Sequence, residues 1–84
     1  MKKFYIDITG NEQRKNITVK VFNTNEDDYL NAKKRFSDYN TAREWAKGWA
    51  DFLQEQRDVC EIEINDYISD DLGVIWYNEN DDEQ

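Results

Sequence analysis

The side chains in this sequence that could take part in chemistry are almost all carboxylates. The chain of 84 residues has no histidine, which removes the commonest general base and every Ser–His or Cys–His nucleophile. Its two serines, Ser37 and Ser69, lie outside any nucleophile-elbow motif, and its three glycines are too scattered to form a phosphate-binding loop. Carboxylates alone can hydrolyse glycosides, but they need a cleft that holds two of them at a fixed separation. A chain this short rarely offers such a cleft, so we predict that the protein is not an enzyme.

The acidic segment from Asp66 to Glu79 invites comparison with a calcium-binding EF-hand loop. Counted from Asp66, the third position is Ile68, Asp71 stands where glycine is required, and Tyr77 stands where glutamate is required. A solvated acidic loop is the simpler interpretation, with weak and nonspecific Mg²⁺ or Ca²⁺ binding as the alternative. We therefore expect no specific metal site and no cofactor.

The totals indicate one folded domain in the cytoplasm. Twelve aromatic residues are too many for a disordered chain, and 84 residues make a single domain with a modest core. The only cysteine, Cys60, cannot form an intramolecular disulfide and is expected to be buried and inert. The N-terminus shows no signal peptide, and no apolar run approaches the roughly 20 residues of a membrane span.

The charges are distributed very unevenly along the chain. Residues 58–84 hold ten carboxylates and no basic residue, whereas all eleven lysines and arginines lie in residues 1–57 with nine carboxylates. The net charge of −8 is therefore the sum of about +2 and −10. A surface this negative repels phosphate backbones and attracts basic surfaces, so the asymmetry is information about partners.

Four segments alternate apolar and polar residues with the period of a half-buried strand. In the third of them, Cys60, Ile62 and Ile64 are expected to face inward and Glu61 and Glu63 outward. The four predicted strands are Lys3–Thr9, Asn16–Asn23, Val59–Asn65 and Gly73–Asn78.

Two segments are predicted to be helical. Residues 41–56 begin with a capping box, Thr41 to Glu44, and continue with apolar residues at helical spacing, which places Trp45 and Trp49 in the core. Gly48 within this helix suggests a close approach by another element. Residues 25–36 are predicted as a short helix because acids begin the segment and bases end it, as the helix dipole favours.

Together these elements predict an α+β fold in ββααββ order. We expect a four-stranded antiparallel sheet, ordered 2-1-3-4, packed against one main helix and one short helix. Residues 1–78 would form this single domain, and residues 79–84 an acidic C-terminal tail.

The acidic face of this sheet is the strongest candidate for a binding site. Two carboxylates two residues apart on one strand lie about 6.7 Å apart, so a cluster of them can imitate part of a nucleic-acid backbone. The alternative is that the acids serve solubility only. A basic patch of Lys33, Lys34 and Arg35 with Arg43 and Lys47 is a weaker candidate for direct nucleic-acid binding. The predicted partner-binding residues are Asp7, Glu61, Glu63, Asp66, Asp70, Asp71, Trp76 and Tyr77.

The chain resembles small inhibitors encoded by bacteriophages and mobile elements. The resemblance lies in its size, its single cysteine Cys60, the order of its elements and its acidic block from Glu61 through Asp71 to Glu83. Inhibitors of this kind are the anti-CRISPR and DNA-mimic inhibitors, and the resemblance is one of overall character that carries no contact residues over to this chain. It implies an acidic protein that occupies the basic nucleic-acid-binding surface of a host nuclease or CRISPR effector in the host cytoplasm, without binding nucleic acid or membrane itself. The alternative is a non-enzymatic interaction or adaptor protein that binds through an aromatic patch around Trp76 and Tyr77.

Overall fold

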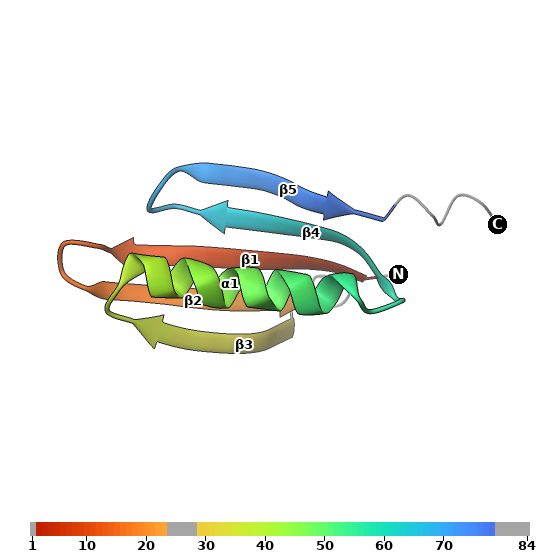
Figure 1. The fold of residues 1–84 in the computed structure, drawn as a ribbon, viewed down its shortest axis with the longest axis horizontal. Helices are drawn as coiled ribbons and strands as arrows, with labels where there is room; N and C mark the ends of the chain where they lie inside the picture. The colour runs from red at the N-terminus through yellow and green to blue at the C-terminus, as the bar shows by residue number, and fades with distance from the viewer. Residues whose placement is uncertain (1, 24–28, 79–84) are drawn as a thin grey trace.

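The computed structural model describes residues 2–23 and 29–78. It is an α+β fold in which one helix packs on one face of a five-stranded sheet (Figure 1). The elements are β1 (Lys2–Asn11), β2 (Asn16–Asn23), β3 (Tyr29–Phe36), α1 (Tyr39–Gln54), β4 (Val59–Asp66) and β5 (Asp71–Tyr77).

The hairpin of β1 and β2 forms as the alternating pattern predicts. On each of the two strands every second side chain is buried, and these side chains form the centre of the core against the helix. Gly10 lies one residue before the end of β1, opposite Ile17. Its φ of +126° is closed to most L residues, and a Cβ there would clash with the carbonyl oxygen of Asn16. Glycine is therefore required at this position. The buried residues of the hairpin are Phe4, Ile6, Ile8, Ile17, Val19 and Val21.

The predicted short helix at residues 25–36 is wrong, because Tyr29–Phe36 form the edge strand β3. Its residues pair with β2, which places Ala32 opposite Val21 and Phe36 opposite Ile17. The unpaired edge of β2 offers this segment a full ladder of backbone hydrogen bonds, and tertiary context of this kind overrides weak local propensity. The residues expected to start that helix, 25–28, lie outside the described residues, as does the predicted acidic tail at 79–84.

The prediction of an antiparallel four-stranded sheet is also wrong. The observed order is β3-β2-β1-β4-β5, which keeps the predicted neighbours and adds β3 at one edge, but β1 and β4 run parallel. The cause is the additional strand: β3 reverses the chain once more before the helix, so β4 enters the sheet in the direction of β1. The segment from β3 through α1 to β4 is consequently a crossover connection, as parallel strands require.

Helix α1 begins three residues earlier than its predicted first helical residue. Asp38, and not Thr41, is the N-cap: its carboxylate accepts hydrogen bonds from the backbone N–H and from the hydroxyl of Thr41, both at 2.9 Å. The hydrogen bonds from Thr41 hold the pKa of Asp38 below its ordinary value. The buried stripe of the helix consists of Ala42, Ala46, Ala50 and Leu53.

Small side chains on that stripe let the helix lie close to the sheet, where it packs over β1, β2, β3 and β4. Figure 1 shows that β5 lies clear of it at the sheet's far edge. Gly48 does not face another element, contrary to expectation, because a Cβ there would meet no atom within 4 Å. Trp45 and Trp49 pack against the core but remain half-buried on the flank of the helix.

Candidate functional site

The face of the sheet opposite α1 carries half of the predicted binding residues. We call this surface the open face, since no helix of the described residues covers it. The strand registers place one row of open-face side chains across all five strands. In order from β3 to β5 this row is Leu30, Phe22, Tyr5, Glu63 and Val74.

The β5 end of the open face is the most exposed apolar part of it. We define the β5 patch as Leu72, Val74 and Tyr77, which pair with Asn65, Glu63 and Glu61 of β4. Their exposed fractions are 52%, 52% and 57%. The three side chains project from one edge strand to one side, and exposed apolar side chains gathered in this way mark protein interaction sites.

A strip of carboxylates borders the β5 patch. Asp7, Glu61 and Glu63 lie on the open face of β1 and β4, which are adjacent strands. Lys3 bridges two of them, with its Nζ 3.2 Å from a carboxylate oxygen of Glu61 and 4.0 Å from one of Glu63. The hydrogen bond to Glu61 raises the pKa of Lys3 above its ordinary value. The strip therefore remains acidic, but part of its charge is balanced within the protein.

The same lysine also lies over an aromatic ring of the open face. Its Nζ is 5.1 Å from the centroid of the Tyr5 ring, a cation–π distance. On the other side of the strip, the Asn65 side chain donates a hydrogen bond of 3.1 Å to the Asp7 carboxylate. These contacts fix the orientation of the strip before any partner binds.

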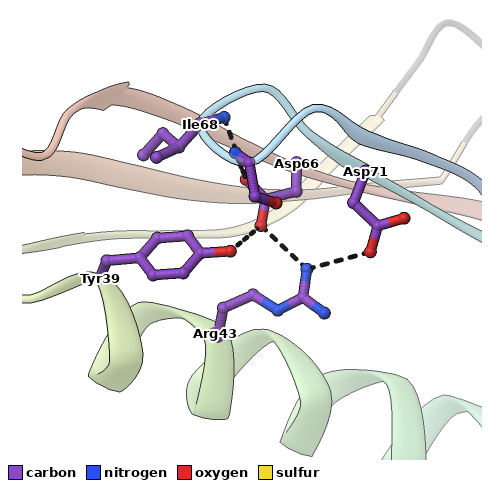
Figure 2. Close-up of polar contacts among 6 residues, drawn as sticks. Tyr39, Arg43, Asp66, Ile68 and Asp71 are labelled. Carbon is purple, nitrogen blue, oxygen red and sulfur yellow. Dashed lines mark hydrogen bonds and ion pairs between the residues drawn. The ribbon is translucent and has the colours of Figure 1, made fainter.

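Asp66 does not belong to this surface, although the sequence suggested that it would. The residue is fully buried at the end of β4, on the helix side of the sheet, and its carboxylate accepts four hydrogen bonds (Figure 2). One oxygen accepts from the Tyr39 hydroxyl at 2.5 Å and from the Arg43 guanidinium at 2.8 Å. The other accepts from the backbone N–H groups of Ile68 and Ser69, each at 3.0 Å.

These contacts set the protonation of the whole cluster. Burial raises the pKa of Asp66, but the hydrogen bonds from Tyr39, Ser69 and Arg43 outweigh it and hold that pKa below its ordinary value. Burial, followed by the hydrogen bond to Asp66, raises the pKa of Tyr39. Since every lone pair of the carboxylate is directed at a donor, Asp66 is a structural anion that joins α1 to the β4–β5 turn.

The remaining predicted residues are dispersed. Asp70 is exposed in the β4–β5 turn with a φ of 62°, and Asp71 is 68% exposed and lies 3.7 Å from Arg43. Trp76 is half-buried against the core on the helix side of the sheet, because it pairs with buried Ile62. The structure thus brings four of the eight predicted residues together on the open face: Asp7, Glu61, Glu63 and Tyr77.

The predicted basic patch is divided by the fold. Lys33, Lys34 and Arg35 lie on β3, where the Lys34 ammonium is 5.5 Å from the Phe36 ring centroid. Arg43 binds Asp66 inside the cluster described above. The cations therefore do not form one surface.

The structure also places the side chains that could bind a metal ion and the thiol of Cys60. Within residues 2–23 and 29–78 no three His, Cys, Asp or Glu side chains are grouped so that they could hold a metal ion. Cys60 is half-buried where full burial was expected, because an irregularity opposite Lys2 and Lys3 lets Val59 take the inward position.

Comparison with known proteins finds no match to this chain among family models, curated proteins or solved structures. In the part of the chain that the structure describes, no helix is long and apolar enough to cross a membrane.

Sequence reasoning missed Leu72 and Val74 as site residues. Leu72 was assigned to an acidic loop, and Val74 was expected in a strand without a defined face. The signal was available in the alternation of Leu72 and Val74 around Gly73, but β5 also contains a register shift opposite Ile62 and Glu63. That shift places Tyr77, and not Trp76, on the face of Val74.

Proposed function

We propose that this chain is a non-catalytic protein-binding module that docks through the β5 end of its open face. The observation that carries the proposal is the β5 patch: three large apolar side chains, each about half exposed, on an edge strand that the helix does not cover. The acidic strip beside it supplies a charged rim. An apolar centre with a charged rim is the usual composition of a protein interface.

The residues of the two edge strands, β3 and β5, indicate why β5 is the strand that would bind a partner. β3 carries Lys33, Lys34 and Arg35, which are charges of the kind that keep an edge strand from pairing with another chain. β5 has no lysine, arginine or proline, and its one charged residue, Asp71, stands at its first position. An extended segment of a partner can therefore add to β5 as a sixth strand and place alternate side chains on the β5 patch.

The partner that fits this surface is basic. Asp7, Glu61 and Glu63 on the open face, and Asp70 and Asp71 at the nearby turn, give the β5 end a negative field, and the whole chain carries a charge of −8. This field speeds the association of a positively charged partner, while the apolar patch supplies contacts that salt does not screen.

An inhibitor that occupies the nucleic-acid-binding surface of a nuclease or CRISPR effector is the second candidate. It is favoured by the presence of three carboxylates on one face of adjacent strands. It is weakened by Asp66, which is buried, and by Lys3, which balances Glu61 and Glu63 from within. In that case the acids, and not the β5 patch, would carry most of the affinity.

A comparison of variants in one capture experiment separates the two. The protein is immobilised and exposed to host lysate at low and moderate salt, and captured proteins are quantified for wild type, Val74→Lys and the pair Glu61→Lys, Glu63→Lys. Gln13→Lys, in the exposed β1–β2 turn, is the control for added charge.

If the module docks through β5, the Val74 variant loses the partner, the Gln13 variant retains it, and moderate salt weakens capture only partly. An inhibitor of the acidic type would lose its partner on charge reversal and at moderate salt, and excess duplex DNA would displace that partner. Retention of the partner by Val74→Lys at wild-type levels would contradict the docking proposal.

A further inference from the structure

One flank of α1 carries a row of aromatic rings that the sheet does not cover completely. Trp45 and Trp49 are half-buried, and Phe52, one turn further along, is exposed. The ring centroids of the two tryptophans are 6.2 Å apart with planes at 68°, and those of Trp49 and Phe52 are 5.8 Å apart at 88°. Because neighbouring rings are nearly perpendicular, the row offers both ring faces and ring edges to a ligand.

Gly48 opens a space beside these rings. It lies on the solvent side of the helix, and a Cβ at this position would have no atom within 4 Å. Glycine is among the least favourable residues for a helix interior, so its effect here is to leave room and not to stabilise the helix. The resulting groove has a volume of about 470 Å³ and is lined by Glu44, Trp45, Gly48, Trp49 and Phe52.

The negative charge in the lining of the groove favours a positively charged ligand. Glu44 is the only charged residue of its lining, and in the described part of the chain this carboxylate forms no ion pair. Asp51 and Glu55 follow it on the same stripe of the helix, and although Lys47 lies between Glu44 and Asp51, the stripe keeps a net negative charge. Ring faces and a carboxylate together attract a cation with a flat apolar surface.

We propose that this groove binds an arginine side chain of a basic partner segment. A guanidinium group stacks on aromatic rings, is less strongly hydrated than an ammonium group, and can bind a carboxylate through two N–H donors. This site lies on the helix, on the other side of the sheet from the β5 patch, and it stands whether or not the open face binds a protein.

The test is an NMR titration of the ¹⁵N-labelled protein with N-acetyl-arginine methylamide. The neutral citrulline amide, which has nearly the same shape, is the matched ligand. We expect the indole N–H signals of Trp45 and Trp49 to shift in a saturable way while that of Trp76 stays in place. Arginine amide should bind roughly 3- to 30-fold more tightly than citrulline amide, which is the range of one cation–π contact with its charge.

Two substitutions locate the site. Glu44→Gln should weaken arginine binding about 2- to 5-fold, as expected for the loss of one exposed ion pair. The matched control Glu55→Gln removes the same charge from the same stripe outside the groove, and it should leave the affinity unchanged. Gly48→Leu fills the groove and should abolish binding, while the amide spectrum shows that the fold is retained.

Four results would overturn the proposal. The citrulline amide could bind as tightly as the arginine amide, or Gly48→Leu could bind arginine as well as wild type. Equal effects of Glu44→Gln and Glu55→Gln would show that arginine responds only to the overall charge of the helix. A proline-rich peptide that shifts the same indole signals at lower concentration than arginine amide would assign the groove to a different occupant.

Discussion

Asp66→Asn is the substitution that tests the structure most directly. It keeps the size and shape of the side chain but removes the charge, and it replaces an acceptor oxygen with a donating amide. Whichever way the amide is turned, it directs an N–H at groups that already donate, either Tyr39 and Arg43 or the backbone of Ile68 and Ser69. The substitution therefore breaks a buried charged network from its centre.

The expected loss in the free energy of unfolding follows from the burial of Asp66. Removing one partner of a buried ion pair typically costs about 3–5 kcal/mol. Arg43 is 38% exposed and can regain water after the change, so the lower end, about 3 kcal/mol, applies here. For a domain of this size, such a loss corresponds to a fall in Tm of roughly 10–20 °C. It removes a large part of a total stability that is on the order of 4–13 kcal/mol.

The assay is urea and thermal unfolding followed by far-UV circular dichroism, with Asp71→Asn as the matched control. Asp71 is 68% exposed and also contacts Arg43, so its loss should cost no more than about 1 kcal/mol. Because the pKa of Asp66 is lowered in the folded state, its contribution is complete above its unfolded pKa of about 3.9 and disappears as the pH falls below that value. The stability difference between wild type and Asp66→Asn should shrink over that range. A loss no larger than that of Asp71→Asn, or a difference that does not change with acid, would refute the assignment of Asp66 as a structural anion.

Four further substitutions test local features of the fold, each by the same unfolding measurements. Gly10→Ala should destabilise the protein by more than about 1 kcal/mol, because the φ of +126° and the contact with the Asn16 carbonyl leave no room for a Cβ; an unchanged Tm would contradict this geometry. Asp38→Ala should cost about 1 kcal/mol through loss of the N-cap, and Thr41→Ala should cost less because the cap of Asp38 on the Thr41 N–H remains. Gly48→Ala should stabilise the helix by up to about 1 kcal/mol because the added methyl group meets only solvent, so destabilisation would show that the position is more crowded than it is here.

The elements that the sequence predicted correctly are those with a strong periodic signal. Alternation located β1, β2 and the two C-terminal strands, and helical spacing located α1 to within a few residues. β3 was missed because its cations suited a helix C-terminus as well as they suit an unpaired edge. Because β3 was missed, β4 was predicted to run antiparallel to β1 when it runs parallel, and one wrongly assigned segment made the predicted topology wrong.

The candidate site was predictable only in part, for a related reason. Strand parity was sufficient to place Glu61 and Glu63 on one face, and their alignment with Asp7 followed once β1 and β4 were neighbours. Asp66 has the parity of Ile62 and Ile64, which face the helix, but the predicted strand ended at Asn65 and so left Asp66 in a loop. Its partners Tyr39 and Arg43 are 27 and 23 residues away in the chain, so the network around it could not be predicted from the pattern of one strand. The face of Tyr77 depended on an irregularity of pairing that composition does not reveal.

The carboxylates of residues 58–84 do more than make this part of the chain negatively charged. Asp66 is used to hold the β4–β5 turn against α1, Asp71 adds a weak contact to the same arginine, and Glu61 and Glu63 are oriented by Lys3. The turn that Asp66 fixes leads directly into β5, the strand on which the exposed apolar side chains lie. An edge strand can bind a partner tightly only if its own position is fixed beforehand, since ordering it on binding would consume part of the affinity. In the docking that we propose, the buried anion and the apolar patch are therefore two parts of one arrangement: internal charge pairing positions the strand, and apolar contact would bind the partner.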